Sequence, residues 1–302
     1  NKIAHQLMEI ENGFGEEALH IARLTALLHD IGHLPWSHLG EQAYEAYLFD
    51  REGGGLDLEA KTQDTSNHLL NRLANYSPAK KIHEQIGAYL IRQHPQLKRH
   101  LGSDEAEVVA SILEKSDLVQ QNKTLQLVRS IISSALDADR LDYLIRDSQS
   151  TGVRYGLVDA DFLIRNIRVG EYEGQKLLCV REEALVAVEH FLFSRLFHYM
   201  QVVYHKNVTT FEAVARALMY RMIQKGFLYN RFNKLEDMYE FALSEQWYNF
   251  DDKHVFGLAR EFANDVKTDD LDRALAGAII DRKRPIIVCE MRGVFTKGTG
   301  PE

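Results

Sequence analysis

Two short stretches of this sequence hold side chains of the kinds that bind metal ions or phosphate groups. The first spans residues 27–38 and reads LLHDIGHLPWSH, which places His29 beside Asp30 and adds His33 and His38 shortly afterwards. Burying an imidazole next to a carboxylate costs several kcal/mol unless each is paired or bound to a metal ion. A divalent metal ion would satisfy both groups at once. We therefore expect a metal or phosphate site here, and the alternative is a set of capping and core hydrogen bonds.

The second stretch spans residues 136–147 and reads LDADRLDYLIRD, in which four aspartates alternate with apolar residues and two arginines. Helical spacing of three and four would bring a carboxylate, a phenol and a cation onto one face. The members of that face would be Asp139, then Asp142 or Tyr143, then Arg146 or Asp147. The same pattern is typical of a solvated helix with internal ion pairs. The companion His29-Asp30 pair favours the functional interpretation.

The elements that must position these residues are mostly helices. A near-continuous apolar pattern predicts a buried helix over residues 16–30, and Gly32 and Pro35 should end it. His33 and His38 would then leave from a turn beside the His-Asp pair. A hairpin is predicted from residues 167–169 and 176–180, a short strand over 285–290, and a mobile glycine-rich connection over 51–66. Further helices are predicted over residues 108–118, 125–136, 184–204, 211–226 and 235–244, with Gly226 as a C-terminal stop.

The composition excludes several classes of protein. The chain has 302 residues, a net charge of −8, 45% hydrophobic residues and two cysteines, Cys179 and Cys289. These values fit a globular protein with a sizeable core and no disulfide framework, as expected in a reducing, cytoplasmic compartment. No stretch reads as a signal peptide or a membrane span. Duplex nucleic acid is a poor partner for an acidic chain, because phosphate contacts require clustered lysine and arginine.

The ordered motifs resemble the HD-domain metal-dependent phosphohydrolase superfamily. They are the His-Asp-Ile-Gly-His segment at residues 29–33, the His83-Glu84 pair, and Asp-Ala-Asp-Arg-Leu-Asp-Tyr at residues 137–143. The closest branch is that of the deoxynucleoside triphosphate triphosphohydrolases. The resemblance runs from about residue 4 to residue 206 and implies a mainly α fold, an HD-domain helical bundle with a small β-hairpin. We expect residues 1–220 to form the catalytic core and residues 221–302 to form a helical C-terminal extension packed on it.

The resemblance implies that a divalent metal ion is held by His29, Asp30 and Asp139. Relatives add one more histidine. His20 lies nine residues before His29, a rotation of about 900° that puts it on the opposite helix face, and the context of His5 does not match. We therefore expect the remaining ligand to lie upstream of residue 1. Ligand type alone leaves manganese, iron, magnesium, nickel and zinc open.

The resemblance also implies roles around the phosphate. His33, His38 and His83 would surround the scissile phosphate, with His83 as the acid, base or proton shuttle. Glu84 would orient His83, and Glu41 stands where the triphosphohydrolase branch has a carboxylate. Substrate contacts are expected from Arg140 and Arg195 to the phosphates, and from Tyr143 and Asp147 to the sugar.

The leading hypothesis is hydrolysis of a deoxynucleoside triphosphate to deoxynucleoside and tripolyphosphate. The alternatives are an HD-type nucleotidase or phosphodiesterase, and a catalytically impaired nucleotide-binding regulatory module. By resemblance a homo-oligomer is expected. The basic cluster at residues 281–284 could bind an activating nucleotide at a subunit interface, although a solvated basic run is the favoured interpretation.

Overall fold

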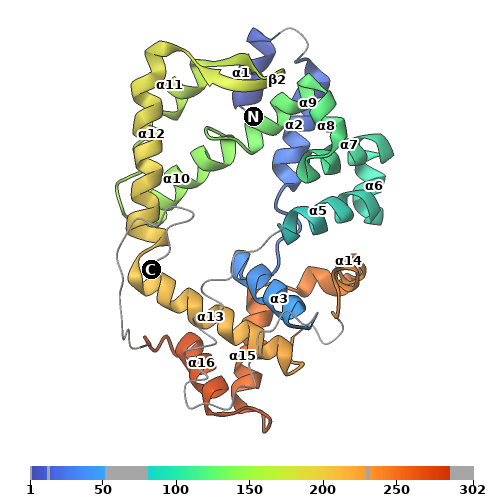
Figure 1. The fold of residues 1–302 in the computed structure, drawn as a ribbon, viewed down its shortest axis with the longest axis vertical. Coiled ribbons are helices and arrows are strands. Elements are labelled where there is room, and N and C mark those ends of the chain that lie inside the picture. The colour runs from blue at the N-terminus through green and yellow to red at the C-terminus, as the bar shows by residue number, and fades with distance from the viewer. Residues whose placement is uncertain (1, 12–13, 52–80, 229–231, 286–302) are drawn as a thin grey trace.

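The protein is described here by a computed structural model that covers residues 2–11, 14–51, 81–228 and 232–285. Apart from one two-stranded antiparallel sheet, the regular structure of these residues is helical (Figure 1). The predicted mainly α fold with a small hairpin is therefore confirmed. No helix in these ranges is both long and apolar enough to span a bilayer.

One hydrophobic core gathers the first helices and the hairpin. It contains α1 (Lys2–Ile10), α2 (Glu16–Leu28), α7 (Ser103–Glu114), α8 (Asp117–Gln121) and α9 (Lys123–Ile132). Strands β1 (Ile167–Tyr172) and β2 (Gln175–Val180) pair from Ile167↔Val180 to Tyr172↔Gln175 and pack on α1 and α9. α10 (Ala138–Thr151), α11 (Ala160–Arg165) and α12 (Leu185–His198) contribute buried residues to the same core.

A second hydrophobic core lies at the other end of the molecule (Figure 1). It is built from α3 (His38–Arg51), α13 (Lys206–Gln224), α14 (Leu235–Ala242), α15 (Asp252–Asn264) and α16 (Asp270–Ile280). α5 (Ile82–Gln93) contributes to both cores, with Ala88 and Ile91 in the first and Ile86 and Leu90 in the second. α6 (Pro95–Leu101) follows it, a π-turn over Tyr199–Val203 extends α12, and 3-10 turns span Glu182–Ala184 and Glu245–Asn249.

The predicted helices are present with shifted ends. The helix predicted over residues 108–118 is two helices, because Lys115 adopts a left-handed conformation (φ 60°, ψ 40°) that ends α7. α13 ends before Gly226, whose φ of 76° suits the predicted stop. Residue 220 lies inside α13, and the division of the chain there stays a prediction. The strand predicted over 285–290 and the connection over 51–66 lie outside the described residues except at their first residues.

Candidate functional site

A cavity of about 580 Å³ opens where the end of α2 meets α5, α7, α9 and α10. Its wall brings together side chains that are far apart in the sequence. All the predicted site residues except Arg195 line it, namely His29, Asp30, His33, His38, His83, Glu84, Asp139, Arg140, Tyr143 and Asp147. The two stretches singled out by their chemistry therefore face one space.

The turn after α2 is shaped by a close approach to α5. α2 ends at Leu28, two residues before the predicted end, and residues 29–32 form a turn. A Cβ on Gly32 would lie 2.2 Å from the backbone oxygen of His83 and 2.3 Å from the backbone nitrogen of Gly87. Trp36 and Ser37 then take positive φ values of 60° and 49° before α3 begins. This tight path presents the His-Asp pair and the following histidine to α5.

His29, Asp30 and Asp139 form a donor set that suits a divalent cation. His29 Nε2 lies 3.2 Å from Asp30 Oδ2. Burial raises the pKa of Asp139, His29 lowers it, and the neighbouring carboxylates Asp137 and Asp30 raise it further. Within the described part of the chain Asp139 has no hydrogen bond or ion pair. A partly buried carboxylate repelled by its neighbours is stabilised by a bound cation, so these residues fit the predicted metal.

The carboxylate of Asp137 accepts hydrogen bonds from backbone nitrogens of its own stretch. Asp137 is 2% exposed and accepts hydrogen bonds from the backbone nitrogens of Arg140 (2.7 Å) and Ser134 (2.9 Å). It therefore caps the N-terminus of α10. Its oxygen also lies 3.2 Å from the Arg140 guanidinium. The cap fixes the first turn of α10, which carries Asp139 and Arg140.

Tyr143 and Asp147 follow Asp139 at successive turns of α10, and all three side chains line the cavity. Asp142 and Arg146 instead pair with each other at 2.9 Å on an exposed face. The structure thus separates the two faces that the sequence left open.

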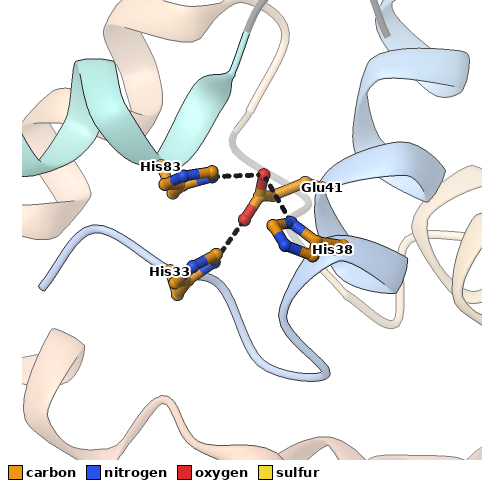
Figure 2. A group of neighbouring side chains, drawn as sticks. All are labelled: His33, His38, Glu41 and His83. Carbon is orange, nitrogen blue, oxygen red and sulfur yellow. Dashed lines mark hydrogen bonds and ion pairs between the residues drawn. The ribbon is translucent and has the colours of Figure 1, made fainter. Parts of the chain in front are cut away.

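Three histidines, His33, His38 and His83, surround Glu41 in a second cluster, which we call the Glu41 cluster (Figure 2). Glu41 Oε1 lies 2.5 Å from His33 Nδ1, and Glu41 Oε2 lies 2.8 Å from His83 Nδ1 and 3.7 Å from His38 Nδ1. The rings of His33 and His83 stack with centroids 4.0 Å apart. His33 also lies 3.4 Å from Asp30, which joins this cluster to the first donor set.

Hydrogen bonds between opposite charges in this cluster shift the pKa values of its members. Burial alone would lower the pKa of His33, but hydrogen bonds with Asp30 and Glu41 raise it to about 9. Burial alone would raise the pKa of Glu41, but the three histidines hold it well below its usual range. The hydrogen bond with His33 lowers the pKa of Asp30. His33 is consequently a cation at neutral pH, held against the buried Glu41 carboxylate.

One atom from each of His33, His38, Glu41 and His83 lies within 4.8 Å of the others, so this cluster could also hold a metal ion. It differs from the predicted set of His29, Asp30 and Asp139. The Nδ1 atoms of His33 and His83 already contact the Glu41 carboxylate. A cation at the first set and a proton network at the second therefore suit the geometry together.

The expected role of Glu84 is wrong. Glu84 contacts Lys81 at 2.8 Å and Lys115 at 3.9 Å, whereas His83 is oriented by Glu41. Consecutive residues of a helix point about 100° apart, so Glu84 and His83 face different parts of the cavity wall. The sequence named Glu41 only as a carboxylate position, because its contact with His83 spans 42 residues.

Arg195 does not line the cavity. Burial would lower its pKa, but hydrogen bonds with Tyr199 and Tyr143 raise it above its usual value. Arg195 therefore interacts with Tyr143 outside the cavity lining. His198, which the sequence left without a role, lies 3.5 Å from Asp147 and 5.3 Å, ring to ring, from Tyr143.

The remaining candidates lie elsewhere. His5 contacts Arg23 at 2.8 Å and His20 contacts Glu105 at 3.4 Å, and neither lines the cavity. Lys283 pairs with Asp281 at 2.8 Å, as in a solvated charged run, and an activating nucleotide there stays a prediction. Sequence reasoning missed three cations that line the cavity. They are Lys81 at the start of α5, Lys115 at the end of α7 and Arg129 in α9. No motif marks them, since they come from separate elements.

Comparison with known proteins places this geometry in a family. Residues 2–147 match the HD domain family. The chain is 31% identical over 182 residues to an uncharacterized protein of Mycoplasma pneumoniae, covering 59% of this chain and 36% of that protein. It is 25% identical over 224 residues to the deoxynucleoside triphosphate triphosphohydrolase SAMHD1 of Gallus gallus, covering 71% and 35%. The chain thus spans about a third of the length of these two relatives.

The fold has a solved counterpart in a phosphohydrolase from Bacteroides thetaiotaomicron, with a TM-score of 0.63, 20% identity, and coverage of 94% of this chain and 62% of that one. HD domains bind divalent metal ions. The matched range ends at the residue that closes the second stretch, and it includes His29, Asp30, the Glu41 cluster and Asp139. Residues 2–147 of this chain are an HD domain.

Proposed function

We propose that this protein is a metal-dependent phosphohydrolase that converts deoxynucleoside triphosphates to deoxynucleoside and tripolyphosphate. The observation that carries the proposal is the single cavity shared by His29, Asp30 and Asp139, the Glu41 histidine cluster and the side chains of α10. The name of the Gallus gallus relative supports the choice of substrate.

His29, Asp30 and Asp139 would hold the divalent ion, with manganese, iron, magnesium, nickel and zinc as candidates. When bound, such an ion supplies Lewis acidity toward a phosphoryl oxygen and makes water more acidic. Asp137 keeps Asp139 in place by capping α10. Histidine and aspartate donors suit this group of metals without selecting one.

His33, His38 and His83 are proposed to act on the phosphate. The cationic His33 would stabilise negative charge that builds up on phosphoryl oxygens. His83 presents Nδ1 to Glu41, so its Nε2 would transfer protons at the reacting group. Glu41 is a positioning residue, because it fixes the orientation of both rings. Glu84 takes no part in that arrangement.

Recognition of the nucleotide is assigned to α10 and α12. Arg140 would contact phosphate, and Tyr143 and Asp147 would contact the sugar, with Asp147 accepting a hydrogen bond from a hydroxyl. A tyrosine packed on deoxyribose would exclude a ribose by crowding at the 2′ carbon. Arg195 would act on phosphate only if it turned away from Tyr143, so we propose it as a positioning residue for that ring.

The test is product identification with the protein loaded with each candidate metal in turn. Deoxynucleotides, ribonucleotides, monophosphates and a phosphodiester are offered. Release of tripolyphosphate supports the proposal. Orthophosphate release from monophosphates would show a nucleotidase, cleavage of the diester would show a phosphodiesterase, and binding without turnover would show a regulatory module.

Asp139→Ala tests the metal assignment. We expect it to lower metal content and turnover together, by more than the 10–100-fold that loss of an outer-shell partner costs. Asp142→Ala is the matched control, because Asp142 lies on the exposed face of the same helix and pairs with Arg146. Full metal content in Asp139→Ala would overturn the ligand set.

We also propose that the protein is a homo-oligomer. The support is a row of exposed apolar side chains along α12, whose inner face is buried.

A further inference from the structure

One part of the cavity wall has an unbalanced charge. Lys81, Lys115 and Arg129 line the cavity around a single carboxylate, Glu84. Lys81 and Lys115 contact its two oxygens at 2.8 and 3.9 Å, and Arg129 interacts with it electrostatically. Three cations therefore face one anion, and we call these four residues the Glu84 cluster.

Arg129 is the member whose charge is least compensated. Its side chain is half-buried, and burial lowers its pKa while Glu84 raises it. Within the described residues its guanidinium makes no hydrogen bond or ion pair. Withdrawing a cation from water without a partner is costly. A guanidinium held in this way inside a cavity is suited to an anionic ligand, which it can bind with two parallel hydrogen bonds.

The Glu84 cluster lies in the same cavity as the residues proposed to act on the phosphate. Glu84 directly follows His83, whose ring belongs to the Glu41 cluster. α9, which carries Arg129, leads through Ser133 and the Asp137 cap to Asp139. The Glu84 cluster is thus an extension of the same cavity beyond the histidines, on the α7 and α9 side. Tyr143 and Asp147 come instead from α10, further along the wall.

We propose that Arg129 and Lys115, with Lys81, bind a second anionic group of the substrate, the phosphates that lie beyond the one attacked. This rests on the proposed phosphohydrolase function and assigns residues of this chain to the polyphosphate part of its substrate. A nucleoside monophosphate has no group to place there. Lys115 reaches the cavity from a left-handed C-cap, a position where glycine is the usual residue.

The experiment measures binding of inorganic tripolyphosphate and of orthophosphate to the metal-free chain by calorimetry, so that chelation and turnover do not enter. The wild type should bind tripolyphosphate at least tenfold more tightly than orthophosphate. Arg129→Gln should weaken tripolyphosphate binding about tenfold, and Lys115→Gly about fivefold. Arg99→Gln is the control, because Arg99 is exposed on α6 outside the cavity, and it should bind as the wild type does.

Two results would overturn the inference. One is an unchanged tripolyphosphate affinity in both Arg129→Gln and Lys115→Gly. The other is a wild type that binds both anions equally. If Arg129→Gln does not fold, Lys115→Gly decides alone, since glycine suits its backbone conformation. The binding measurement needs no turnover, so it tests the anion site even if the protein hydrolyses no deoxynucleotide. Product identification likewise tests the proposed reaction even if these residues bind no anion.

Discussion

Glu45 carries a carboxyl whose surroundings disfavour its ionisation. It lies one turn after Glu41 in α3, and its Oε2 is buried without a hydrogen-bond partner in the described part of the chain. Burial, together with the charge of Glu41, raises its pKa from 4.5 to about 7. Between pH 4.5 and pH 7 the folded chain therefore holds a proton that the unfolded chain releases. The free energy of unfolding must fall across this window as the pH rises.

We expect Glu45→Gln to remove that fall. The variant should match the wild type near pH 4.5 and exceed it above pH 7 by roughly 2 kcal/mol, after allowance for partial exposure. Urea unfolding at a series of pH values measures the difference. Glu240→Gln is the control, since Glu240 is exposed at the end of α14, and it should show no such divergence. Equal curves for Glu45→Gln and wild type would refute the assignment.

The sequence predicts contacts between residues that are neighbours in the chain better than contacts between residues that meet only in the folded protein. His29 and Asp30 stand together in the printed sequence, and Tyr143 and Asp147 follow Asp139 at helical spacing. The partner of His83 does not follow from adjacency, which is why Glu84 was the wrong choice and Glu41 the observed one. Arg129 faces the cavity only because α9 packs where it does.

The contact between the turn after α2 and α5 sets the geometry of the whole site. Gly32 has no room for a side chain, because a Cβ would meet the backbone of His83 and Gly87. We expect Gly32→Ala to force the two elements apart, to lower the free energy of unfolding by about 1–3 kcal/mol, and to abolish most turnover by separating His33 from His83. Thermal unfolding and kinetics measure the two effects.

A second glycine gives the opposite expectation. Gly257 lies within α15, and a Cβ there would meet no atom within 4 Å. Alanine has a higher helix propensity than glycine, so Gly257→Ala should raise the free energy of unfolding by about 0.5–1 kcal/mol and leave turnover unchanged. Destabilisation by both substitutions to a similar degree would show that crowding at Gly32 is not the cause.

Element types are readable from periodicity, but some boundaries depend on single residues. Apolar spacing predicted the helices and the hairpin. The break at Lys115 has no signal in residue type, since lysine ordinarily continues a helix. The helix predicted over residues 184–204 continues into a π-turn at Tyr199, and no physical account of that change is found in the local sequence.

Two hydrophobic cores meet at α5 in the whole molecule, and the cavity lies at that meeting. The turn after α2 lies there too, and the partly buried Ile31 packs against both cores. Local patterns could not predict this arrangement, because it depends on α3 packing against α13, far along the chain. α14, α15 and α16, which were predicted only as a C-terminal extension, share this second core with α3.

α12 runs along one edge of the molecule (Figure 1). Its inner residues Phe191, Ser194 and His198 are buried. Most of its exposed side chains are apolar, apart from Glu189 and His190, and a large exposed apolar patch marks an interaction surface. The exposed apolar residues are Leu185, Val186, Leu192, Phe193, Leu196 and Phe197 on α12, Met200 and Tyr204 just after it, and Val208 at the start of α13. Nine such side chains, each about half exposed, offer roughly 800–1,000 Å², close to the ~800 Å² per partner of a standard interface.

An exposed apolar patch of this kind can meet the same patch of a second copy about a twofold axis. We therefore expect light scattering to show a dimer with twice the chain mass of 34.7 kDa. Phe193→Glu and Phe197→Glu should each give a monomer, because each substitution would bury an unpaired charge in the interface. Val266→Glu is the control: Val266 is 95% exposed in a loop away from α12, and isolated apolar side chains need no partner. A wild type that runs as a monomer at micromolar concentration would refute the dimer, and a dimer that survives both phenylalanine substitutions would place its interface elsewhere. Since Arg195 and His198 contact Tyr143 and Asp147 from the inner face of α12, covering the outer face would also hold the sugar-facing side chains in place.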